Sequence, residues 1–487
     1  MDVLANSVER SGSTDIAPRP KVICVDLDGT LVRSDTLLES ILALLRRRPY
    51  LVFVLPFWLL GGRAGFKERI ASAIELDVTL LPYNAELVSW LRSQRDAGRI
   101  LVLASATHAT IAEGVARHLK IFSQVFASRG RVNLKAENKA AVLAQAFPDG
   151  FAYAGNSAAD LPVWKAAASA VLVELPTDVR ARLPEALPIE CELLNQSSTA
   201  RGLWRSLRPH QWAKNLLVAV PLLTAHQYGN ASAIAATLLA FAAMCLVASA
   251  IYLVNDLLDL PADRQHETKR FRPLARGDLS IAAGMIAVPL LLLGAALVCW
   301  LLQPEFAIGL GGYVFAAVVY SIFVKHVGWI DTAWLAGLYT LRIAIGALAI
   351  GVPVSHWLFA YSAFAFMSLA LLKRYEEMGG VIEHSPDARI RGYNVRHRIA
   401  VERLGWLCAA MAGVVLMLYL HSDTVQALYR HVQILWIAAG LMTGFLAWMW
   451  LAARRGRMHE DPVVFALREP MSYVVLVGLL GCILLAR

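Results

Sequence analysis

The pattern of hydrophobic and polar positions changes near residue 195 and divides the chain into two dissimilar parts. Before that point, short apolar runs such as VICVDL at 22–27 and ILVLAS at 100–105 alternate with stretches of helical periodicity. Strands that alternate with helices are typical of a parallel α/β domain. We therefore expect an α/β domain over residues 21–190, preceded by a disordered tail at 1–20.

After residue 211, apolar segments long enough to cross a membrane recur. A helix needs about 20 apolar residues to cross the hydrocarbon core of a bilayer. This length predicts about nine transmembrane helices, near 213–227, 233–254, 281–302, 306–324, 330–351, 355–372, 401–420, 432–452 and 471–486. We expect an all-α, multi-pass membrane bundle over residues 206–487, joined to the α/β domain by a linker at 191–205.

The composition excludes an ordinary soluble enzyme. Of the 487 residues, 57% are hydrophobic and only 17% are charged, whereas soluble domains carry about 25% charged residues. The six cysteines are scattered without a CxxC pair, so no disulfide framework or zinc site is implied. The first twenty residues lack the apolar core of a secretory signal, so we expect the N-terminal domain in the cytoplasm.

The net charge of +9 belongs to the apolar part of the chain. Residues 1–200 hold 22 basic and 21 acidic residues, whereas residues 201–487 hold 24 and 16. Lys and Arg beside apolar segments usually record membrane orientation, and no nucleic-acid motif accompanies them, so we expect no nucleic-acid partner. The basic connections follow every second helix, which predicts that they face the cytoplasmic side of the inner membrane and that Arg487 lies on the outer face.

One apolar segment departs from the α/β pattern. PYLVFVLPFWLLGG at 49–62 follows three arginines, Arg46, Arg47 and Arg48. The segment is too short to span a membrane. It is either a buried helix of a small helical cap, or a segment that lies on the membrane surface with its arginines toward anionic lipid.

Two aspartates follow the first predicted strand. The run VICVDL continues into DGT, which places Asp26 and Asp28 at the C-terminal end of a strand, where α/β sheets position their ligands. Two carboxylates at this place suit a metal and a phosphoryl group, because one can attack phosphorus while the other handles the leaving-group proton. The alternative is a simple turn, since Asp-Gly is common turn chemistry.

Further residues in chain order sharpen the interpretation. Ser105 ends the second strand, Lys139 precedes the third, and the third ends in GNSAAD at 155–160. This order resembles the haloacid dehalogenase superfamily of phosphohydrolases, which implies a Rossmannoid α/β fold with a helical cap at about 35–95. The resemblance also implies a nucleophile (Asp26), an acid/base (Asp28), phosphate ligands (Ser105 and Lys139) and magnesium ligands (Asp26, Asp28 and Asp160).

The last motif departs from the superfamily pattern. It usually reads GDxxxD, and here Asn156 stands in place of the first acid, which removes one negative charge beside the metal. An amide oxygen can still coordinate Mg²⁺. Two alternatives stay open, an active phosphatase and a degenerate phosphate-binding or scaffolding module.

A row of acids marks the end of the second membrane helix, in YLVNDLLDLPADRQHETKRFRPLARG. Asp256, Asp259 and Asp263 are spaced i, i+3 and i+7, which is one helical face. Carboxylates at a membrane boundary are costly unless neutralised, and oxygen-rich sets suit Mg²⁺. Five bases follow, more than the local acids require, so we expect a second anion there: Arg264, Lys269, Arg270, Arg272 and Arg276. The alternative is a solvated loop that only sets topology.

The NDxxDxxxD pattern resembles the UbiA-type intramembrane prenyltransferase superfamily. The resemblance extends to RPHQWAKN at 208–215, and it implies substrate contacts for Lys214 and Asn215. It implies catalytic roles for Asp256 and Asp259, and a Mg²⁺ site formed by Asn255, Asp256, Asp259 and Asp263.

A second motif departs from the aromatic prenyltransferases of this superfamily. They usually carry a further aspartate-rich motif, where this chain has LLKRYEEM with Lys373 and Arg374. A basic pair favours direct contact with anionic oxygens. With YSIFVK, which contains Tyr320 and Lys325, the chain looks most like the decaprenyl-phosphate phosphoribosyltransferase branch, in which phosphoribosyl pyrophosphate donates and a polyprenyl phosphate accepts.

The predicted substrate contacts of this transferase are Lys214, Asn215, Lys269, Arg270, Arg272, Tyr320, Lys325, Arg342, Lys373 and Arg374. Arg342 stands midway along an apolar segment, where a charge is costly, so either it or Lys325 is expected to hold the lipid phosphate. Snorkelling or pairing with a backbone carbonyl is the alternative for Arg342. The alternative for the whole chain is a transferase that moves a polyprenyl group from its diphosphate to an aromatic acceptor, with a non-catalytic N-terminal domain.

The two parts fit one reaction sequence. A phosphoribosyl lipid carries a 5-phosphate, which a phosphohydrolase tethered at the same membrane face can remove. The non-enzymatic alternative is that the N-terminal domain covers or regulates the membrane site.

Overall fold

The computed structural model describes residues 19–129, 134–194, 198–382, 389–390, 393–458 and 462–486. Residues 1–18 of the expected tail and Arg487 lie outside the described residues. The chain forms two compact units. The first comprises the residues up to Ser206 together with Leu253–Ile286, and the second comprises Leu207–Tyr252 and Ala287–Arg487.

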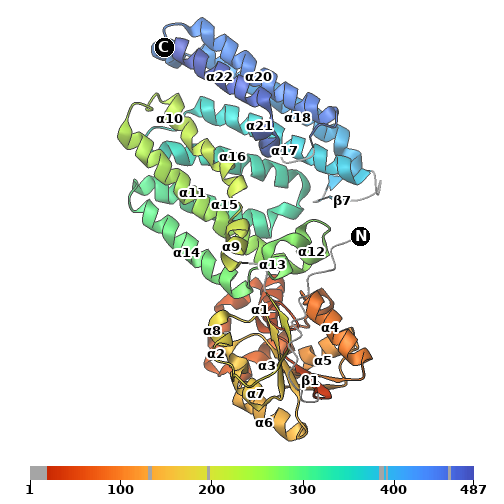
Figure 1. Cartoon of the computed structure of the whole chain (residues 1–487). Helices are drawn as coiled ribbons and strands as arrows, with labels where there is room; N and C mark the ends of the chain where they lie inside the picture. The colour runs from red at the N-terminus through yellow and green to blue at the C-terminus, as the bar shows by residue number, and fades with distance from the viewer. Residues whose placement is uncertain are drawn as a thin grey trace. The chain divides into compact units, whose positions relative to one another are not determined.

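A parallel six-stranded sheet organises the first unit, in the order β3-β2-β1-β4-β5-β6 (Figure 1). Its strands are β1 Val22–Val25, β2 Ile100–His108, β3 Gln124–Ser128, β4 Ala152–Gly155, β5 Ser169–Val173 and β6 Ile189–Leu193. The central strand β1 pairs with both β2 and β4, so the strand order reverses there. Ligands of open α/β sheets bind outside the carboxyl ends of the strands at such a switch point. The predicted α/β fold is confirmed.

Helices cover both faces of this sheet, because alternate residues of each strand point to opposite sides. On one face, Ile23 and Val25 pack with α4 (Ala85–Asp96) and α5 (Ala109–Leu119). On the other face, Cys24 packs with residues of three further helices, namely α6 (Glu137–Ala146), α7 (Leu161–Ala166) and α8 (Thr177–Arg180). Burial on both faces explains why these strands read as continuous apolar runs.

A small helical cap lies between β1 and α4 in the chain. It consists of α1 (Thr36–Arg47), η1 (Pro49–Phe53), α2 (Leu55–Leu60), α3 (Arg63–Ala73) and η2 (Val78–Leu80). Asp35 starts α1 by accepting hydrogen bonds from the backbone N–H groups of Leu37 and Leu38. The cap has its own apolar cluster, which includes Leu44, Phe66 and Ile70. It covers less of the chain than expected, since α4 packs on the sheet.

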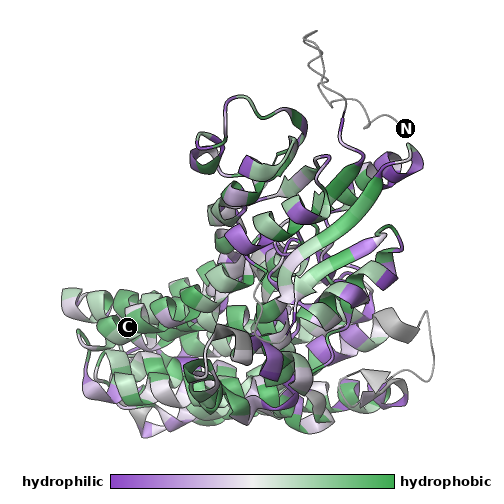
Figure 2. Ribbon diagram, turned by 90° about the horizontal axis from the view of Figure 1, so that it is seen from below, coloured by the Kyte–Doolittle hydropathy of each residue, from purple (hydrophilic) through white to green (hydrophobic). Residues whose placement is uncertain are grey.

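Seven helices of the described chain are long and apolar enough to cross a membrane, and hydrophobic residues predominate along them in Figure 2. They are α11 Ala231–Leu258, α14 Ile281–Cys299, α15 Pro304–Ile322, α16 Gly328–Ala349, α17 His356–Ile382, α18 Arg398–Leu420 and α20 Val432–Arg454. A shorter apolar helix, α22 (Pro470–Ala486), follows them. The predicted membrane bundle is confirmed.

The predicted number of about nine spanning helices is not reproduced in the described residues. The segment expected at 213–227 is divided between η4 (Pro209–Ala219), a 3-10 helix, and the short α10 (Val220–Thr224). Pro221 has no N–H to continue a hydrogen-bonded helix through this point. Hydropathy measures the apolar character of such a segment but not its backbone conformation.

Candidate functional site

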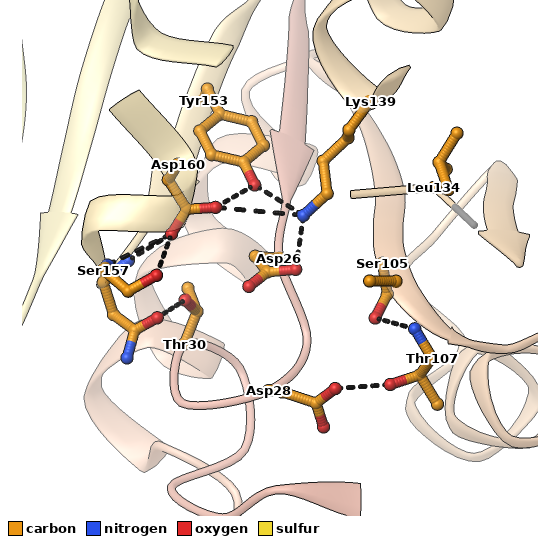
Figure 3. A network of polar contacts seen from close by, with 12 residues as sticks. Asp26, Asp28, Thr30, Ser105, Thr107, Leu134, Lys139, Tyr153, Ser157 and Asp160 are labelled. Atoms are coloured by element: carbon orange, nitrogen blue, oxygen red, sulfur yellow. Dashed lines mark hydrogen bonds and ion pairs between the residues drawn. The ribbon is translucent and has the colours of Figure 1, made fainter. Parts of the chain in front are cut away.

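The predicted phosphatase residues meet at the carboxyl edge of the sheet (Figure 3). Asp26 follows β1 directly, and its backbone N–H donates to the Ala154 carbonyl of β4. Ser105 lies in β2, Lys139 in α6 and Asp160 in η3 (Ala158–Asp160). All four of these predicted side chains are buried. The fold therefore brings together residues that are widely separated in the sequence.

Lys139 is the central cation of this edge. Its Nζ donates hydrogen bonds to Asp26 Oδ1 at 2.8 Å and to the Tyr153 hydroxyl at 2.9 Å, and it lies 3.8 Å from Asp160 Oδ1. Burial raises the pKa of Asp26 to about 7, although the charge of Lys139 opposes this shift. Burial alone would lower the pKa of Lys139, but the charges of Asp26 and Asp160 outweigh it and raise the pKa. Lys139 is therefore held as an ammonium ion beside the candidate nucleophile.

Asp160 is held by four hydrogen bonds. The Tyr153 hydroxyl donates to its Oδ1 at 2.7 Å. Its Oδ2 accepts from the backbone N–H groups of Asn156 and Ser157, at 3.2 and 3.1 Å, and from the Ser157 hydroxyl at 3.1 Å. These hydrogen bonds hold the loop that follows β4 in place beside the Asp26 site. Tyr153 was not predicted, because a tyrosine in a strand usually belongs to the core.

Asn156 packs against the DGT turn. Its Oδ1 accepts a hydrogen bond from the Thr30 hydroxyl at 3.2 Å. Gly29 has a φ of +79°, and a Cβ there would lie 2.2 Å from Asn156 Nδ2. The close approach and the positive φ both require glycine at position 29.

The oxygen donors at this edge are sparse for a metal ion. No group of three or more His, Cys, Asp or Glu side chains in the described ranges is arranged to hold one. The donors at this edge include the Asp26 carboxylate and the Asn156 amide oxygen. Mg²⁺ is often bound by only one or two carboxylates, with water and substrate phosphate completing its shell. The residues therefore fit Mg²⁺ in that sparse form.

Asp28 lines a small pocket. Its Oδ1 accepts from the backbone N–H of Thr36 at 2.8 Å, and its Oδ2 accepts a short hydrogen bond from the Thr107 hydroxyl. Burial raises the pKa of Asp28, and the charge of Asp35 adds to the shift. A carboxyl whose pKa is raised holds its proton more firmly than an ordinary aspartate, which suits a general acid.

The pocket beside Asp28 has a volume of about 50 Å³ and includes residues of the cap. Lys67 of α3 lines it, and its Nζ donates to the Ala106 carbonyl at 2.9 Å. Thr107 lines the same pocket, and its backbone N–H donates to Ser105 Oγ at 3.1 Å. Neither Lys67 nor Thr107 was predicted, because a single lysine on a helix and a threonine in a strand form no recognisable motif.

The aspartate-rich segment also belongs to the first unit. Asp256 lies near the end of α11, Asp259 precedes α12 (Leu260–Gln265), and Asp263 lies within α12. Arg272 Nη1 lies 3.0 Å from Asp256 Oδ1 and 2.5 Å from Asp263 Oδ2. Burial raises the pKa of Asp263, although Arg272 opposes the shift. The structure brings together Asp256, Asp263 and Arg272, while Asn255 and Asp259 are half-buried on the same segment.

The other predicted bases of this loop differ in exposure. Lys269 is half-buried, and Arg270 and Arg276 are exposed. Asp256 and Asp263 place two carboxyl groups beside one guanidinium. These carboxylates fit Mg²⁺ in chemistry and number.

Arg264 has a protein partner instead of the anionic substrate expected for the bases of this loop. Its guanidinium forms a two-point ion pair with Glu39 of α1, with N–O distances of 2.6 and 3.1 Å. It also donates to the carbonyls of Leu80 and Ala275, each at 3.1 Å. Glu39 accepts a further hydrogen bond from the Ser34 hydroxyl at 2.6 Å. Both charged side chains are buried, so the pair fixes the position of α12.

A second close approach lies in the same loop. Gly277 has a φ of +86°, and a Cβ there would lie 2.7 Å from Arg33 Cβ and 3.0 Å from the Arg33 carbonyl oxygen. Arg33 is itself paired with Glu174 at 3.0 Å. The loop that carries the bases therefore packs on the segment that follows the DGT turn.

Arg342 in the second unit donates three internal hydrogen bonds. Its guanidinium donates to Asn215 Oδ1 at 3.2 Å, to the Tyr313 hydroxyl at 2.6 Å and to the Leu338 carbonyl at 3.0 Å. The rings of Tyr313 and Tyr339 lie 5.0 and 5.1 Å from the guanidinium carbon. Arg342 therefore does not snorkel, and it joins the predicted residue Asn215 in one cluster. Lys214 adjoins it, with Nζ at 6.0 Å from the Tyr339 ring.

Asp331 collects two predicted residues of the second unit. Tyr320 donates to its Oδ1 at 2.8 Å, and Arg374 Nε lies 2.8 Å from its Oδ2. Arg374 also forms a short ion pair with Glu377. The guanidinium of Arg374 is buried and paired with Asp331 and Glu377. The predicted contact of Arg374 with substrate stays a prediction. Lys325 and Lys373 are half-buried.

Comparison with known proteins gives relatives for most of the chain. The protein y4nM of Sinorhizobium fredii is 36% identical over 93% of this chain and 88% of its own length. A decaprenyl-phosphate phosphoribosyltransferase of Mycolicibacterium smegmatis is 34% identical over 44% of this chain and 68% of its own length.

A solved structure and a family description cover the membrane part. A UbiA homologue from Archaeoglobus fulgidus, solved with GPP and Mg²⁺ bound, is 14% identical with a TM-score of 0.44, over 58% of this chain and 99% of its own. The sequence model of the UbiA prenyltransferase family matches residues 216–476. The seven apolar helices and this match together make the chain a multi-pass membrane protein. Since the match covers more than half of the residues, the chain belongs to the UbiA prenyltransferase family.

Proposed function

We propose that the chain is a membrane transferase that moves a 5-phosphoribosyl group from phosphoribosyl pyrophosphate to a polyprenyl phosphate. A bond forms between the lipid phosphate oxygen and the ribose carbon, the bond from that carbon to pyrophosphate breaks, and pyrophosphate leaves. The observation that carries this proposal is the buried cluster of Asp256, Asp263 and Arg272, with further bases around it. The name of the mycobacterial relative supports the choice of donor and acceptor.

We assign the metal to the aspartate-rich segment, with Asn255, Asp256, Asp259 and Asp263 as its ligands. Mg²⁺, when bound, offsets the charge of the leaving pyrophosphate. Lys269 and Arg270 bind the outer pyrophosphate oxygens by direct charge-assisted hydrogen bonds. Arg272 orients the carboxylates of Asp256 and Asp263 and also binds the pyrophosphate.

The lipid phosphate is assigned to cations of the second unit. Arg342 is the anchor, because Tyr313 and Asn215 hold its guanidinium rigidly. Lys214, Lys325 and Lys373 contribute charge, and Tyr320 and Arg374 position Asp331. Preorganised cations of this kind stabilise charge without reorganising during the reaction.

For the N-terminal domain, residues 21–190, we propose a phosphohydrolase that acts on the phosphoribosyl lipid. Asp26 attacks the 5-phosphate, the ribose hydroxyl leaves with the proton of Asp28, and a phosphoaspartyl group forms. Asp28 then takes a proton from water, which attacks phosphorus and releases phosphate and Asp26. Ser105 and Lys139 bind the phosphate oxygens, while Mg²⁺ is assigned to Asp26, Asp28 and Asp160 together with Asn156.

The transferase is tested with the full chain in lipid nanodiscs, labelled phosphoribosyl pyrophosphate, Mg²⁺ and a polyprenyl phosphate. Phosphoribosyl lipid is the expected product, and Asp256→Asn is expected to lower its rate by at least a hundredfold. Glu267→Gln is the matched control, since this exposed acid lies in the same loop. Product formed only from a polyprenyl diphosphate and an aromatic acceptor would establish an aromatic prenyltransferase instead.

We also propose the inner membrane as the location, with the N-terminal domain and the transferase domain's basic loops, within residues 206–487, on the cytoplasmic face. Arg487 is then on the outer face, which requires an odd number of crossings. Alkaline phosphatase fused after Arg487 should be active, and green fluorescent protein at the same place should be dark. The reverse pattern would contradict this orientation.

A further inference from the structure

The cap segment at 49–60 presents an apolar face that the proposed chemistry does not use. Four large side chains stand out from it, Tyr50, Phe53, Phe57 and Leu60, with exposed fractions of 62%, 77%, 69% and 84%. Isolated exposed apolar residues are ordinary, but a contiguous apolar group usually marks an interaction site. The segment itself therefore requires a partner that covers these side chains.

The opposite face of this segment is packed, so the exposed face is fixed in place. Leu51 belongs to the apolar cluster of the cap, together with Leu44 of α1 and Ile70 of α3. Trp58 packs against the same cluster. The segment is thus apolar on both sides, unlike a surface helix of a soluble protein, which has one polar face.

Basic residues border the apolar face. Arg46, Arg47 and Arg48 end α1 immediately before the segment, and all three are exposed. A group of apolar side chains beside a cluster of arginines is the pattern that binds the interface of an anionic bilayer. A second protein copy would have to offer acids for the same arginines.

The end of a spanning helix adjoins these arginines. Arg46 and Arg47 line a cavity of about 380 Å³ together with Leu257 and Leu258, the last residues of α11. The rest of the cavity wall combines apolar residues such as Leu42 and Leu76 with three acids, Glu39, Glu75 and Asp77. The arginines therefore share a cavity with the last residues of a helix that is long and apolar enough to span a membrane.

We propose that residues 49–60 insert into the interface of the bilayer, with Arg46–Arg48 on anionic lipid phosphates. Insertion would bring the cap to phosphate esters carried by lipids at the membrane surface. This consequence rests on the proposed phosphohydrolase function. The insertion itself is independent of any catalytic activity.

Insertion is tested on the full chain in nanodiscs of phosphatidylcholine with about a third phosphatidylglycerol. A nitroxide at Phe57→Cys should be several times more accessible to oxygen, relative to a water-soluble nickel chelate, than one at Gln145→Cys, an exposed position on α6. The unsubstituted chain, labelled in the same way, gives the background from native cysteines. Equal accessibility at both positions would overturn the proposal, and so would a short distance between the Phe57→Cys labels of two copies.

Two further experiments test the role of the arginines and the effect of insertion on hydrolysis. Replacing Arg46, Arg47 and Arg48 by Gln, or omitting phosphatidylglycerol, should move the Phe57→Cys label toward water. Phe57→Ser with Leu60→Ser should lower hydrolysis of a polyprenyl phosphoribosyl ester about tenfold, while hydrolysis of p-nitrophenyl phosphate is unchanged. Loss of both hydrolyses would contradict the assigned role of this face. No hydrolysis by the unsubstituted chain would contradict the proposed phosphatase and leave the label result to decide insertion.

Discussion

The first unit contains two clusters of carboxylates, and each surrounds one basic residue. Lys139 lies beside Asp26 and Asp160, and Arg272 lies beside Asp256 and Asp263, but the two bases are held in different ways. Lys139 lies on α6, a helix packed on one face of the sheet, is 5% exposed and is fixed by Tyr153. Arg272 lies in an irregular loop and is 28% exposed. Both pairs of carboxylates are buried. The position of Lys139 is thus set by a helix packed on the sheet, whereas the position of Arg272 depends on contacts that hold its loop in place.

Those loop contacts come from distant parts of the chain. Arg264 is paired with Glu39, and Gly277 packs against Arg33. The geometry of Asp256 and Asp263 is therefore tied to the cap and to the segment after the DGT turn. Substitutions at the two clusters should have different consequences.

Removing the fixed cation should have the largest effect. Lys139→Met leaves Asp26 and Asp160 without their common partner, and breaking a buried pair in this way costs about 3–5 kcal/mol. We expect phosphate release to fall by more than a hundredfold and the first unit to unfold at a lower temperature in detergent. Lys139→Arg is the control that keeps the charge. Unchanged phosphate release by Lys139→Met would show that the cluster is not the catalytic one.

Removing the acid that holds the loop comes next. Glu39→Gln leaves Arg264 buried without a counter-charge, for which we expect about 2–4 kcal/mol of destabilisation and a higher Mg²⁺ requirement of the transferase. The double variant Glu39→Gln with Arg264→Met should recover part of the loss. Thermal unfolding and Mg²⁺ titration of transferase activity measure both. Equal effects of Glu39→Gln and the exposed control Glu75→Gln would contradict the pairing.

Gly277→Ala should have a smaller effect. The alanine must adopt a φ of +86° and meets the backbone of Arg33, which costs about 1–3 kcal/mol. We expect a lower unfolding temperature and slower phosphoribosyl transfer. Gly98→Ala is the control, since Gly98 has a similar φ of +88° but open space around its Cβ position. Equal losses would show that strain alone, without the contact, explains the effect.

The pH dependence distinguishes the clusters without substitution. The pKa of Asp26 is raised to about 7, so the folded state binds a proton that the unfolded state releases near pH 4. The protonated Asp26 carboxyl therefore stabilises the folded state fully below about pH 4, and this stabilisation is lost as the pH rises toward 7. Phosphate release should increase over the same upper range, because the attacking carboxylate must be ionised. A rate that is flat from pH 5 to 8 would contradict Asp26 as the nucleophile.

The positions of the phosphatase residues could be predicted because they follow strands. Asp26 directly follows β1, and Ser105 lies within the neighbouring β2, which continues to His108 instead of ending at Ser105 as predicted. Because the two strands are parallel neighbours, the approach of these residues could be expected without knowledge of side-chain contacts. Tyr153 and Glu39 could not be predicted. Each is joined to its partner by tertiary packing, and a single tyrosine or glutamate carries no periodic signal.

The membrane part shows the same limit. Spanning helices such as α11 and α16 were predicted from the length of their apolar runs. The segment 213–227 was predicted in the same way, but it contains Lys214 and Asn215, of which Asn215 is bonded to Arg342, and Pro221 lies in its short helix α10. Hydropathy averages over such residues, and the partner of Asn215 lies far away in the sequence.

The exposed face at 49–60 has a practical consequence for biochemistry. A fragment of residues 19–194 contains none of the seven spanning helices, yet it would carry Phe53, Phe57 and Leu60 uncovered in water. Such a patch promotes self-association. The fragment should therefore form aggregates in plain buffer, disperse in mild detergent, and become monodisperse without detergent when serines replace these three residues.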